Sequence, residues 1–412
     1  MDKIFNNTTI QREVPAISSK SEAHRYLICA ALGDKRCEII CTDSNADIDA
    51  TASCLNALGA TLKREGNKFI VDPIAQVSEN CILDCNESGS TLRFLLPLSA
   101  ALGANCDFIM RGRLPSRPLS PLYELLQDNG ITLSPQGQTP LSTRGKLLAG
   151  EYRIAANISS QYISGLLFAL SVTDGESKLF LEGKTESAPY IEMTVDALKD
   201  FGANIAYNPQ ENCFDIAGQK HLATPNKLVV GGDWSNAAFF LCAGAIGQNP
   251  ITVLGLDEAS RQGDRAILSI LEKMGALITR DHGITVHPSK LRGIEIDASD
   301  IPDLVPIIAT IASVAEGETL ICHAERLRLK ESDRIESVCH TLRALGADVI
   351  PTADGMIIRG KACLNGGTVD SYNDHRIAMS AAIASLVCKS PVTISRFEAI
   401  NKSYPSFADN FL

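Results

Sequence analysis

The sequence lacks the features that mark membrane, secreted and nucleic-acid-binding proteins. No apolar run approaches the roughly 18 residues that a membrane-spanning helix needs, and residues 1–7 contain no signal-peptide core. The net charge of -10 leaves too little positive surface for non-specific binding to nucleic acid. These absences predict a cytoplasmic protein that binds neither membranes nor nucleic acid.

The 13 cysteines show no metal-binding or pairing pattern. Cys-x-x-Cys does not occur, and the closest pairs, Cys37 with Cys41 and Cys81 with Cys85, have no histidine nearby. This spacing argues against a zinc site and favours reduced, mostly buried thiols. Gly-x-Gly-x-x-Gly and Walker loops are also missing, which argues against nucleotide binding by those routes.

A repeat with a nearly constant period runs through the chain. A helix end, a glycine and an apolar strand recur with glycine at 59, 130, 202, 275 and 346, so the steps are 71, 72, 73 and 71. A glycine just after a helix adopts the left-handed conformation without a Cβ clash, and a fixed period indicates repeated units. Five copies account for 5 × 72 = 360 of the 412 residues. The remaining 52 residues, at the two chain ends, are enough to complete a sixth copy.

Six units in a chain too long for one core predict two domains of three units each. Each unit is expected to be a small α/β module, with strands over 227–230 and 250–254 and a helix over 264–274. Crossings near Ser19 and Gly231 predict one domain from residues 1–19 plus 231–412 and an inserted domain from residues 20–230. The polar stretch over 134–150 is expected to be a surface loop.

Several predicted helices begin with clusters of polar or basic residues. Unpaired N–H groups and the helix dipole make a helix start a natural site for an anion. N-capping alone is the simpler interpretation of any one cluster. Four clusters, three of which contain Lys or Arg, together favour binding of phosphate or carboxylate. They span 18–25, 87–93, 157–161 and 373–376.

Three further features carry charge. Lys330 and Arg334 are four residues apart and are expected to share a helix face after a strand over 319–323; a solvated helix start with internal ion pairs is the alternative. The loop over 113–118 is basic and stiffened by proline, which lowers the entropy lost on binding an anion, although it is also compatible with a plain surface loop. Asp303, before an apolar helix over 307–314, is either a cap or a general base.

These segments, in this order, resemble the 5-enolpyruvylshikimate-3-phosphate (EPSP) synthase family, the 3-phosphoshikimate 1-carboxyvinyltransferases. The resemblance covers nearly the whole chain and implies an α/β enolpyruvyl transferase fold with two domains, each of three βαβαββ units, six in total. The matching stretches are Ser19-Lys20-Ser21 with Arg25, 88–93, Arg117-Pro118, Ser159-Ser160-Gln161, 187–190, Gly232-Asp233, Gln262-Gly263-Asp264, Ile301-Pro302-Asp303, 327–334 and 372–376.

The resemblance also implies a reaction. The enolpyruvyl group of phosphoenolpyruvate passes to the 5-hydroxyl of shikimate 3-phosphate and phosphate leaves, in the shikimate pathway to chorismate and the aromatic amino acids. Neither a cofactor nor a metal is expected, and the protein is expected to be a monomer. The implied catalytic residues are Lys20, Asp303 and Glu331. Shikimate 3-phosphate would bind Lys20, Ser21, Arg25, Ser159, Ser160, Gln161, Ser187, Asp303 and Lys330. Phosphoenolpyruvate would bind Lys20, Gly89, Arg117, Gln161, Arg334, Arg376 and Lys402.

Two other functions are compatible with parts of this pattern. The sister family, UDP-N-acetylglucosamine 1-carboxyvinyltransferase, shares the fold but has a reactive cysteine in the loop where this chain has Arg113 to Pro118 without one. A non-catalytic, repeat-built anion-binding protein would bind ligands without turnover, but it leaves Asp303 and Glu331 beside the cations unexplained. Glu87 and Arg326 stand where asparagine is frequent in the EPSP synthase family, a departure that affects details of substrate contact and not the reaction.

Overall fold

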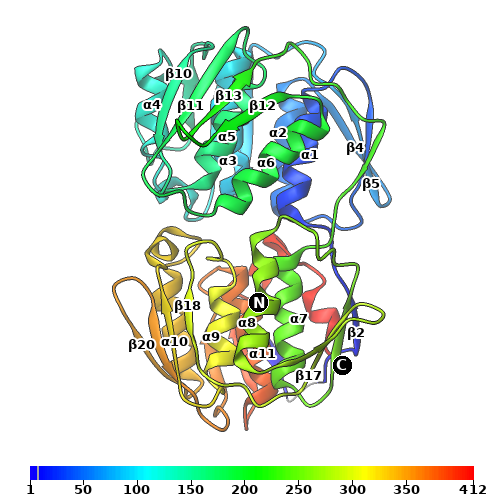
Figure 1. Cartoon of the computed structure of the whole chain (residues 1–412), viewed down its shortest axis with the longest axis vertical. Helices are drawn as coiled ribbons and strands as arrows, with labels where there is room; N and C mark the ends of the chain where they lie inside the picture. The colour runs from blue at the N-terminus through cyan, green and yellow to red at the C-terminus, as the bar shows by residue number, and fades with distance from the viewer. Residues whose placement is uncertain (7–8) are drawn as a thin grey trace. The chain divides into compact units, whose positions relative to one another are not determined.

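The computed structural model describes residues 1–6 and 9–412, and Figure 1 follows their helices and strands along the chain. The chain forms two compact units. The terminal unit comprises Met1–Ile17 and Gly231–Leu412, and the inserted unit comprises Ser18–Val230. Each unit has its own cluster of buried apolar side chains. We propose that each unit is one domain.

The helices and strands of the inserted unit alternate along the chain. In order they are α1 (Lys20–Ala31), β3 (Cys37–Ile40), α2 (Ala46–Leu58), β4 (Thr61–Glu65), β5 (Lys68–Asp72), β6 (Asn80–Asn86), α3 (Gly89–Leu102), β7 (Asn105–Met110), the 3-10 helix η1 (Leu114–Ser116), α4 (Leu122–Asp128), β8 (Thr132–Leu133), β9 (Leu141–Arg144), β10 (Glu151–Ala155), α5 (Ser160–Leu170), β11 (Glu176–Glu182), α6 (Ala188–Asp200), β12 (Asn204–Asn208), β13 (Cys213–Ala217) and β14 (Lys227–Val229).

The terminal unit follows the same alternation. It contains β1 (Lys3–Phe5), β2 (Glu13–Pro15), α7 (Trp234–Ile246), β15 (Ile251–Leu254), η2 (Gly263–Ala266), α8 (Ile267–Met274), β16 (Leu277–Thr279), β17 (Ile284–His287), β18 (Glu295–Asp297), α9 (Val305–Ala312), β19 (Glu318–Cys322), η3 (Glu325–Leu329), α10 (Arg334–Ala344), β20 (Asp348–Pro351), β21 (Met356–Arg359), β22 (Gly367–Asp370), α11 (His375–Ala384), η4 (Ser385–Val387), β23 (Val392–Ser395), η5 (Phe397–Lys402) and η6 (Phe407–Asn410).

The described residues form six small sheets, three in each unit. In the sheet ordered β6-β7-β9-β8, a parallel pair, β6 and β7, is joined through α3, and antiparallel β9 and β8 complete the sheet. The sheets ordered β10-β11-β13-β12 and β18-β19-β21-β20 repeat this arrangement. The six sheets and the helices between their strands agree with the six α/β units that the repeat predicts.

The repeat glycines end the second helix of their units, as predicted. Gly59 follows α2 with φ 115°, and Gly275 follows α8 with φ 99°. The glycines at 130, 202 and 346 also have positive φ. In all five copies the next strand begins two residues after the glycine. This conformation has a low energy mainly for glycine, so a glycine after each of these helices makes the period recognisable in the sequence.

The two chain ends complete a sheet, as the residue count predicts. Strand β1 pairs antiparallel with β23, with Lys3 opposite Ile394, while β22 pairs with β23 in parallel. Strand β2 pairs in parallel with β15, with Val14 opposite Val253. The N-terminal segment therefore contributes strands to two sheets of the terminal unit.

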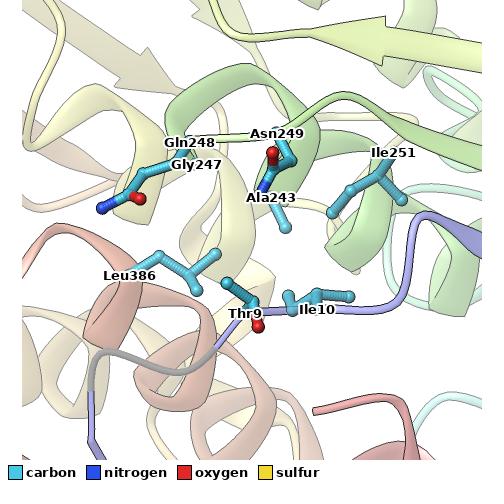
Figure 2. Close-up of a pocket in the computed structure, with 8 residues that line it drawn as sticks. All are labelled: Thr9, Ile10, Ala243, Gly247, Gln248, Asn249, Ile251 and Leu386. Carbon is cyan, nitrogen blue, oxygen red and sulfur yellow. The ribbon is translucent and has the colours of Figure 1, made fainter. Parts of the chain in front are cut away.

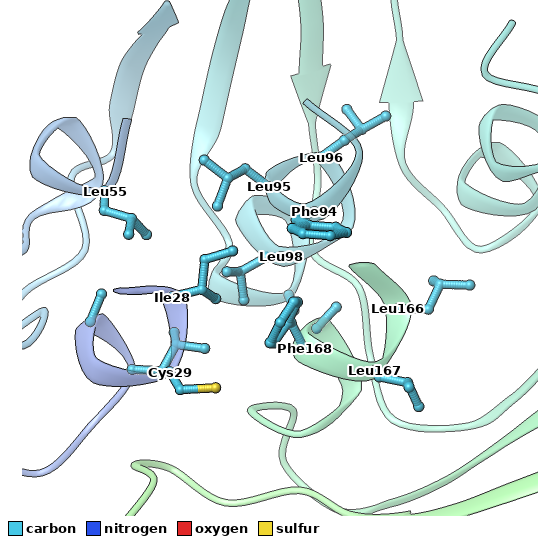
Figure 3. Close-up of a cluster of buried hydrophobic side chains, with 14 of the residues drawn as sticks. Ile28, Cys29, Leu55, Phe94, Leu95, Leu96, Leu98, Leu166, Leu167 and Phe168 are labelled. Atoms are coloured by element: carbon cyan, nitrogen blue, oxygen red, sulfur yellow. The ribbon is translucent and has the colours of Figure 1, made fainter. Parts of the chain in front are cut away.

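The first helix of each repeat is the most deeply buried element. Twelve of the 14 residues of α3 are buried, and a helix that is apolar nearly all round belongs in a core. Helix α3 packs against α5, and in the terminal unit α7, α9 and α11 contact one another. Figure 3 shows Ile28, Phe94 and Phe168, from α1, α3 and α5, among the side chains of the inserted unit's core. The starts of α1, α3, α5 and α11 carry several of the predicted site residues.

Two local predictions are wrong. The stretch over 134–150 is not a plain surface loop, because it contains β9, in which Leu141 and Thr143 are buried. Strand β9 has only four residues, and an alternation of buried and exposed residues this short within a polar stretch was not enough to predict a strand. Lys330 does not share a helix face with Arg334, because α10 begins at Arg334, capped by Asp333, and Lys330 lies in the preceding turn.

A small pocket of about 30 Å³ lies in the terminal unit, beside the N-terminal segment and the end of α7 (Figure 2). No predicted site residue lines it. Its lining residues are Thr9, Ile10, Ala243, Gly247, Gln248, Asn249, Ile251 and Leu386. Over residues 1–6 and 9–412, no helix is both long enough and apolar enough to cross a membrane.

Candidate active site

In the inserted unit, Lys20 is held at the start of α1. The hydroxyl of Ser19 caps this helix by accepting from the Glu22 amide, as serine does at many helix starts. The Lys20 Nζ donates to Asp47 Oδ2 on α2 at 2.8 Å, and both side chains are less than one-fifth exposed. Asp47 therefore fixes the position of the ammonium group, a role that sequence analysis missed.

Gly89 opens α3 beside two guanidinium groups. A Cβ atom at this position would lie 2.5 Å from Arg93 Nη1 and 2.8 Å from Arg117 Nη1. Both arginine side chains are buried, and Ser88 caps the helix by accepting from the Thr91 amide. Two positive charges at a helix N-terminus suit a bound anion. Arg117 was predicted here, whereas Arg93 was not.

The start of α5 lies next to the start of α3. The Gln161 side-chain amide donates to the Ser90 hydroxyl at 2.9 Å, and Ser159 caps α5 by accepting from the Gln161 backbone amide. Ser160 is the first residue of this helix and is largely buried. Ser159, Ser160 and Gln161 therefore lie at the start of α5, beside the start of α3 that carries Gly89.

Arg25 has a different environment from the other predicted ligands. Its guanidinium donates to the backbone oxygens of Ser21 and Tyr190 and to the Thr194 hydroxyl. Burial lowers the pKa of Arg25 to about 10, which leaves the group charged at neutral pH. Tyr190 lies near Ser187, which precedes α6 with φ 54°. Arg25 thus links α1 to α6, and its contact with substrate stays a prediction.

In the terminal unit, Arg334 is the centre of an ion-pair cluster. Its side chain is 1% exposed. Its guanidinium donates to Asp303 Oδ1 at 2.7 Å, to Glu331 Oε2 at 2.8 Å and to Asp374 Oδ2 at 2.8 Å. Burial opposes this charge, but the three carboxylates outweigh it and hold the pKa of Arg334 above its ordinary value.

Asp303 lies just before α9 and has three cations around it. Arg376 donates to Asp303 Oδ2 and to its backbone oxygen, each at 3.1 Å, and Lys330 Nζ is 4.0 Å from Oδ1. Burial alone would raise the pKa of the Asp303 carboxyl, but Arg376, Lys330 and Arg334 outweigh burial and hold it well below its usual range. Asp303 is therefore ionised and binds a proton weakly in this state.

Asp374 orders the same cluster from the start of α11. It is fully buried, accepts from the Arg376 amide as the helix cap, and accepts from Ser332 Oγ at 3.0 Å as well as from Arg334. The two residues before it, at 372 and 373, both have φ 54°, a conformation that costs energy in non-glycine residues. Lys402 Nζ donates to the backbone oxygen of Asn373 at 2.5 Å. This strained turn thus brings Lys402 beside α11.

The pKa of Asp264, a fully buried carboxyl of the terminal unit, is shifted in the opposite direction to that of Asp303. Asp264, in η2, is fully buried and accepts a hydrogen bond from Ser235 Oγ of α7. Burial, reinforced by the charge of Asp303, raises the pKa of Asp264 to about 6. Its folded-state pKa thus exceeds its unfolded value, so the stability that it contributes is complete below about pH 4 and is lost as the pH rises through about 6.

We therefore expect Asp264→Asn to become more stable relative to the parent as the pH rises from 4.5 to 7.5. The relative gain in the free energy of unfolding over this range should be about 2 kcal/mol, less than the full equivalent of the pKa shift, because the unfolded carboxyl is already largely ionised at pH 4.5. Urea unfolding followed by the fluorescence of Trp234, the single tryptophan, reports on the terminal unit. Asp281→Asn removes an exposed carboxyl as the control, and a pH-independent difference for Asp264→Asn would contradict the prediction.

The structure thus gathers the predicted residues into two sets, one in each unit. Among the described residues, no three His, Cys, Asp or Glu side chains are arranged to hold a metal ion. Asp47 was not predicted to carry a role, because a carboxylate near a helix start has many structural uses. Arg93, Asp264 and Asp374 lie inside segments that the sequence pattern singled out, although none of the three was predicted as a site residue.

The sequence matches the model of the family described as EPSP synthase (3-phosphoshikimate 1-carboxyvinyltransferase) over residues 5–411. A relative from Clostridium novyi, named 3-phosphoshikimate 1-carboxyvinyltransferase, is 42% identical, with 97% of this chain and 94% of the relative covered. A relative of the same name from Clostridium perfringens is 41% identical, with 99% and 97% covered.

Solved structures share the fold and confirm the predicted α/β enolpyruvyl transferase fold. An EPSP synthase from Acinetobacter baumannii superimposes with a TM-score of 0.81 at 24% identity, covering 99% of this chain and 97% of that one. The enolpyruvyl transferase NikO from Streptomyces tendae gives a TM-score of 0.76 at 19% identity, with 99% and 96% covered. Because the family match and relatives above 40% identity both span nearly the whole chain, the protein belongs to the EPSP synthase family.

Proposed function

We propose that the protein transfers the enolpyruvyl group of phosphoenolpyruvate to the 5-hydroxyl of shikimate 3-phosphate and releases phosphate. The observation that carries this proposal is the family match over residues 5–411. The buried cations support it, because two substrates with phosphate and carboxylate groups need several preorganised positive charges. The arginines beside Gly89 and the cluster around Arg334 provide such charges.

We assign the substrate contacts as the family resemblance implies. Both substrates contact Lys20 and Gln161. Shikimate 3-phosphate also contacts Ser21, Arg25, Ser159, Ser160, Ser187, Asp303 and Lys330. Phosphoenolpyruvate also contacts Gly89, Arg117, Arg334, Arg376 and Lys402.

In the proposed reaction the 5-oxygen of shikimate 3-phosphate bonds to C2 of phosphoenolpyruvate while C3 gains a proton. Asp303 takes the proton of the 5-hydroxyl, which is a poor nucleophile until then. The tetrahedral ketal phosphate that results loses a proton from C3 as its C2–O bond to phosphate breaks, and the enol ether forms. Glu331, which also accepts a hydrogen bond from Arg334, is the candidate for proton transfer at C3.

The contacts of Asp303 suggest when it becomes a useful base. Arg334 and Arg376 donate to Asp303, and the same two side chains are assigned to phosphoenolpyruvate. A bound anion competes for these N–H groups, so Asp303 loses part of its charge compensation. Its pKa then rises toward the ordinary value, and its affinity for the 5-hydroxyl proton rises with it. Binding of phosphoenolpyruvate thereby activates the base.

Arg376→Lys should weaken phosphoenolpyruvate binding while the affinity for shikimate 3-phosphate stays nearly intact. Lysine keeps the charge but loses the planar fork that contacts Asp303 through two N–H groups. We expect the KM for phosphoenolpyruvate to rise about tenfold, the cost of one lost charge-assisted contact. Steady-state kinetics measure this value, and Arg396→Lys, at an exposed arginine that pairs with Asp370, is the matched control. An equal effect of both variants would contradict the assignment.

The experiment that tests the function is an assay of phosphate release with phosphoenolpyruvate and each candidate acceptor. Release that requires shikimate 3-phosphate supports the proposal. Release with UDP-N-acetylglucosamine instead would assign the sister activity. Calorimetric binding of shikimate 3-phosphate without release in the presence of both substrates would favour a non-catalytic anion-binding protein.

A further inference from the structure

A series of buried hydrogen bonds joins helices α1, α2 and α3 of the inserted unit. His24 Nδ1 of α1 lies 2.7 Å from Thr51 Oγ1 of α2, and this hydroxyl lies 2.6 Å from Thr91 Oγ1 of α3. Thr91 Oγ1 in turn donates to Ser88 Oγ at 2.7 Å. All four side chains are at most 1% exposed. Buried polar contacts of this kind specify one arrangement of the elements that carry them.

The protons in this series can be assigned by elimination. The Thr91 hydroxyl donates to Ser88, so the short contact with Thr51 needs the Thr51 proton. Thr51 must then accept from His24, which places the histidine proton on Nδ1. The other neutral tautomer would leave two oxygen lone pairs facing each other at 2.6 Å.

The surroundings of His24 agree with a neutral ring. Burial, together with the charges of Lys20 and Arg25, holds the pKa of His24 well below its usual value. Its Nε2 atom has no hydrogen-bond partner in the described part of the chain, and the ring meets Phe94 edge-on at 6.4 Å. The neutral Nδ1–H form leaves only an acceptor unsatisfied in this apolar setting, whereas a histidinium would bury a charge.

These hydrogen bonds lie one helical turn beyond the contact between Lys20 and Asp47. Lys20 precedes His24 by four residues, and Asp47 precedes Thr51 by four, so Lys20–Asp47 and His24–Thr51 are successive contacts between α1 and α2. Thr91 then ties this pair of helices to α3, next to Gly89. The contacts through Thr51, together with a longer contact of 3.5 Å between Thr91 Oγ1 and the Asp47 backbone oxygen, therefore link the Lys20 ammonium to the start of α3.

We propose that Thr51 is a positioning residue that holds Lys20 and Gly89 in register to bind phosphoenolpyruvate. Thr51 does not itself contact a substrate; it acts through its hydrogen bonds to His24 and Thr91. The inference rests on the proposed function, because Lys20 and Gly89 are assigned to phosphoenolpyruvate there.

The test compares Thr51→Val, which keeps the shape and removes both hydrogen bonds, with Thr51→Ser, which keeps the hydroxyl. We expect Thr51→Val to raise the KM for phosphoenolpyruvate by about one order of magnitude, since small misplacements of binding groups have effects of this size or larger. The KM for shikimate 3-phosphate and kcat should change much less, and Thr51→Ser should restore most of the lost affinity. Thr173→Val removes a buried hydroxyl at the far end of α5 as the matched control.

If Thr51→Val folds poorly, Thr91→Val can replace it in the test, because this variant removes the hydrogen bonds of Thr91 to Thr51 and Ser88. It should raise the KM for phosphoenolpyruvate in the same way. An unchanged KM for phosphoenolpyruvate in a folded Thr51→Val variant of an active enzyme would overturn the proposal. So would an equal rise in Thr173→Val, because a general loss of stability would then explain both.

A spectroscopic measurement separates this inference from the proposed function. Nitrogen-15 NMR of the histidine side chains, with His24 assigned by loss of its signals in His24→Gln, should show the Nδ1–H tautomer in the parent and its loss in Thr51→Val. An Nε2–H tautomer or a histidinium in the parent would overturn the network. A parent that releases no phosphate would instead count against the proposed function, and the NMR result would still decide whether this series of hydrogen bonds exists.

Discussion

Asp303→Asn is expected to lower turnover by roughly two to four orders of magnitude, the usual contribution of acid–base catalysis. Asparagine keeps the shape of the side chain and a hydrogen-bonding oxygen, but it cannot accept the 5-hydroxyl proton at neutral pH. Shikimate 3-phosphate affinity should change much less, because Arg334 and Arg376 can still donate to the asparagine oxygen. Steady-state kinetics give kcat, and calorimetry gives the affinity.

The control for Asp303→Asn is Asp300→Asn, three residues earlier at an exposed position. It should leave turnover close to that of the parent. If Asp303→Asn also turned over at nearly the parent rate, Asp303 would be a binding or structural carboxylate, and Glu331 would become the first candidate for the base.

Arg334→Met should be the most destabilising of the proposed substitutions, and it should abolish most of the activity. Methionine fills much of the volume but leaves Asp303, Glu331 and Asp374 without their shared cation. Removing one partner from a buried ion-pair network costs about 3–5 kcal/mol, because uncompensated charge stays buried. Urea unfolding at pH 7, followed by the fluorescence of Trp234, measures this loss in the terminal unit.

The matched control is Arg328→Met, which removes a nearby arginine whose side chain is 32% exposed and which pairs with Asp333 and Glu336. Its effect should be much smaller, because solvent screens exposed pairs. A loss in Arg334→Met no larger than that in Arg328→Met would show that the cluster does not stabilise the unit.

The pH dependence of the Arg334 effect follows from its partners. Burial alone would raise the pKa values of Asp303 and Asp374, but neighbouring positive charges outweigh it and lower both. These charges are Arg376, Lys330 and Arg334 around Asp303, and Arg334 and His375 around Asp374. Their stabilisation is therefore present above the unfolded pKa of about 4 and is lost as the pH falls below it. The difference in stability between the parent and Arg334→Met should narrow as the pH is lowered from 6 toward 3.

The features that could be predicted from the sequence are those that depend on local backbone chemistry. The repeat could be recognised because glycine has no Cβ atom to clash in the left-handed conformation that follows a helix, and all five glycines have positive φ. The starts of α1, α3, α5 and α11 could be predicted because a capping side chain accepts hydrogen bonds from backbone amides only two or three residues away. The fold and the family followed from the order of these segments.

Contacts between side chains that are far apart in the sequence could not be predicted, because they depend on how the helices pack. Lys20 and Asp47 are 27 residues apart, and Arg334 and Asp374 are 40 apart, so no local rule pairs them. Sequence placed Lys330 on a helix face with Arg334, but the Asp333 cap starts α10 after Lys330. Asp264 and Asp303 are both aspartates, yet the pKa of Asp264 is raised and the pKa of Asp303 is lowered. The reason is physical: the charge on a buried carboxyl depends on which cations surround it, and packing between helices, not the sequence around each carboxyl, brings those cations near.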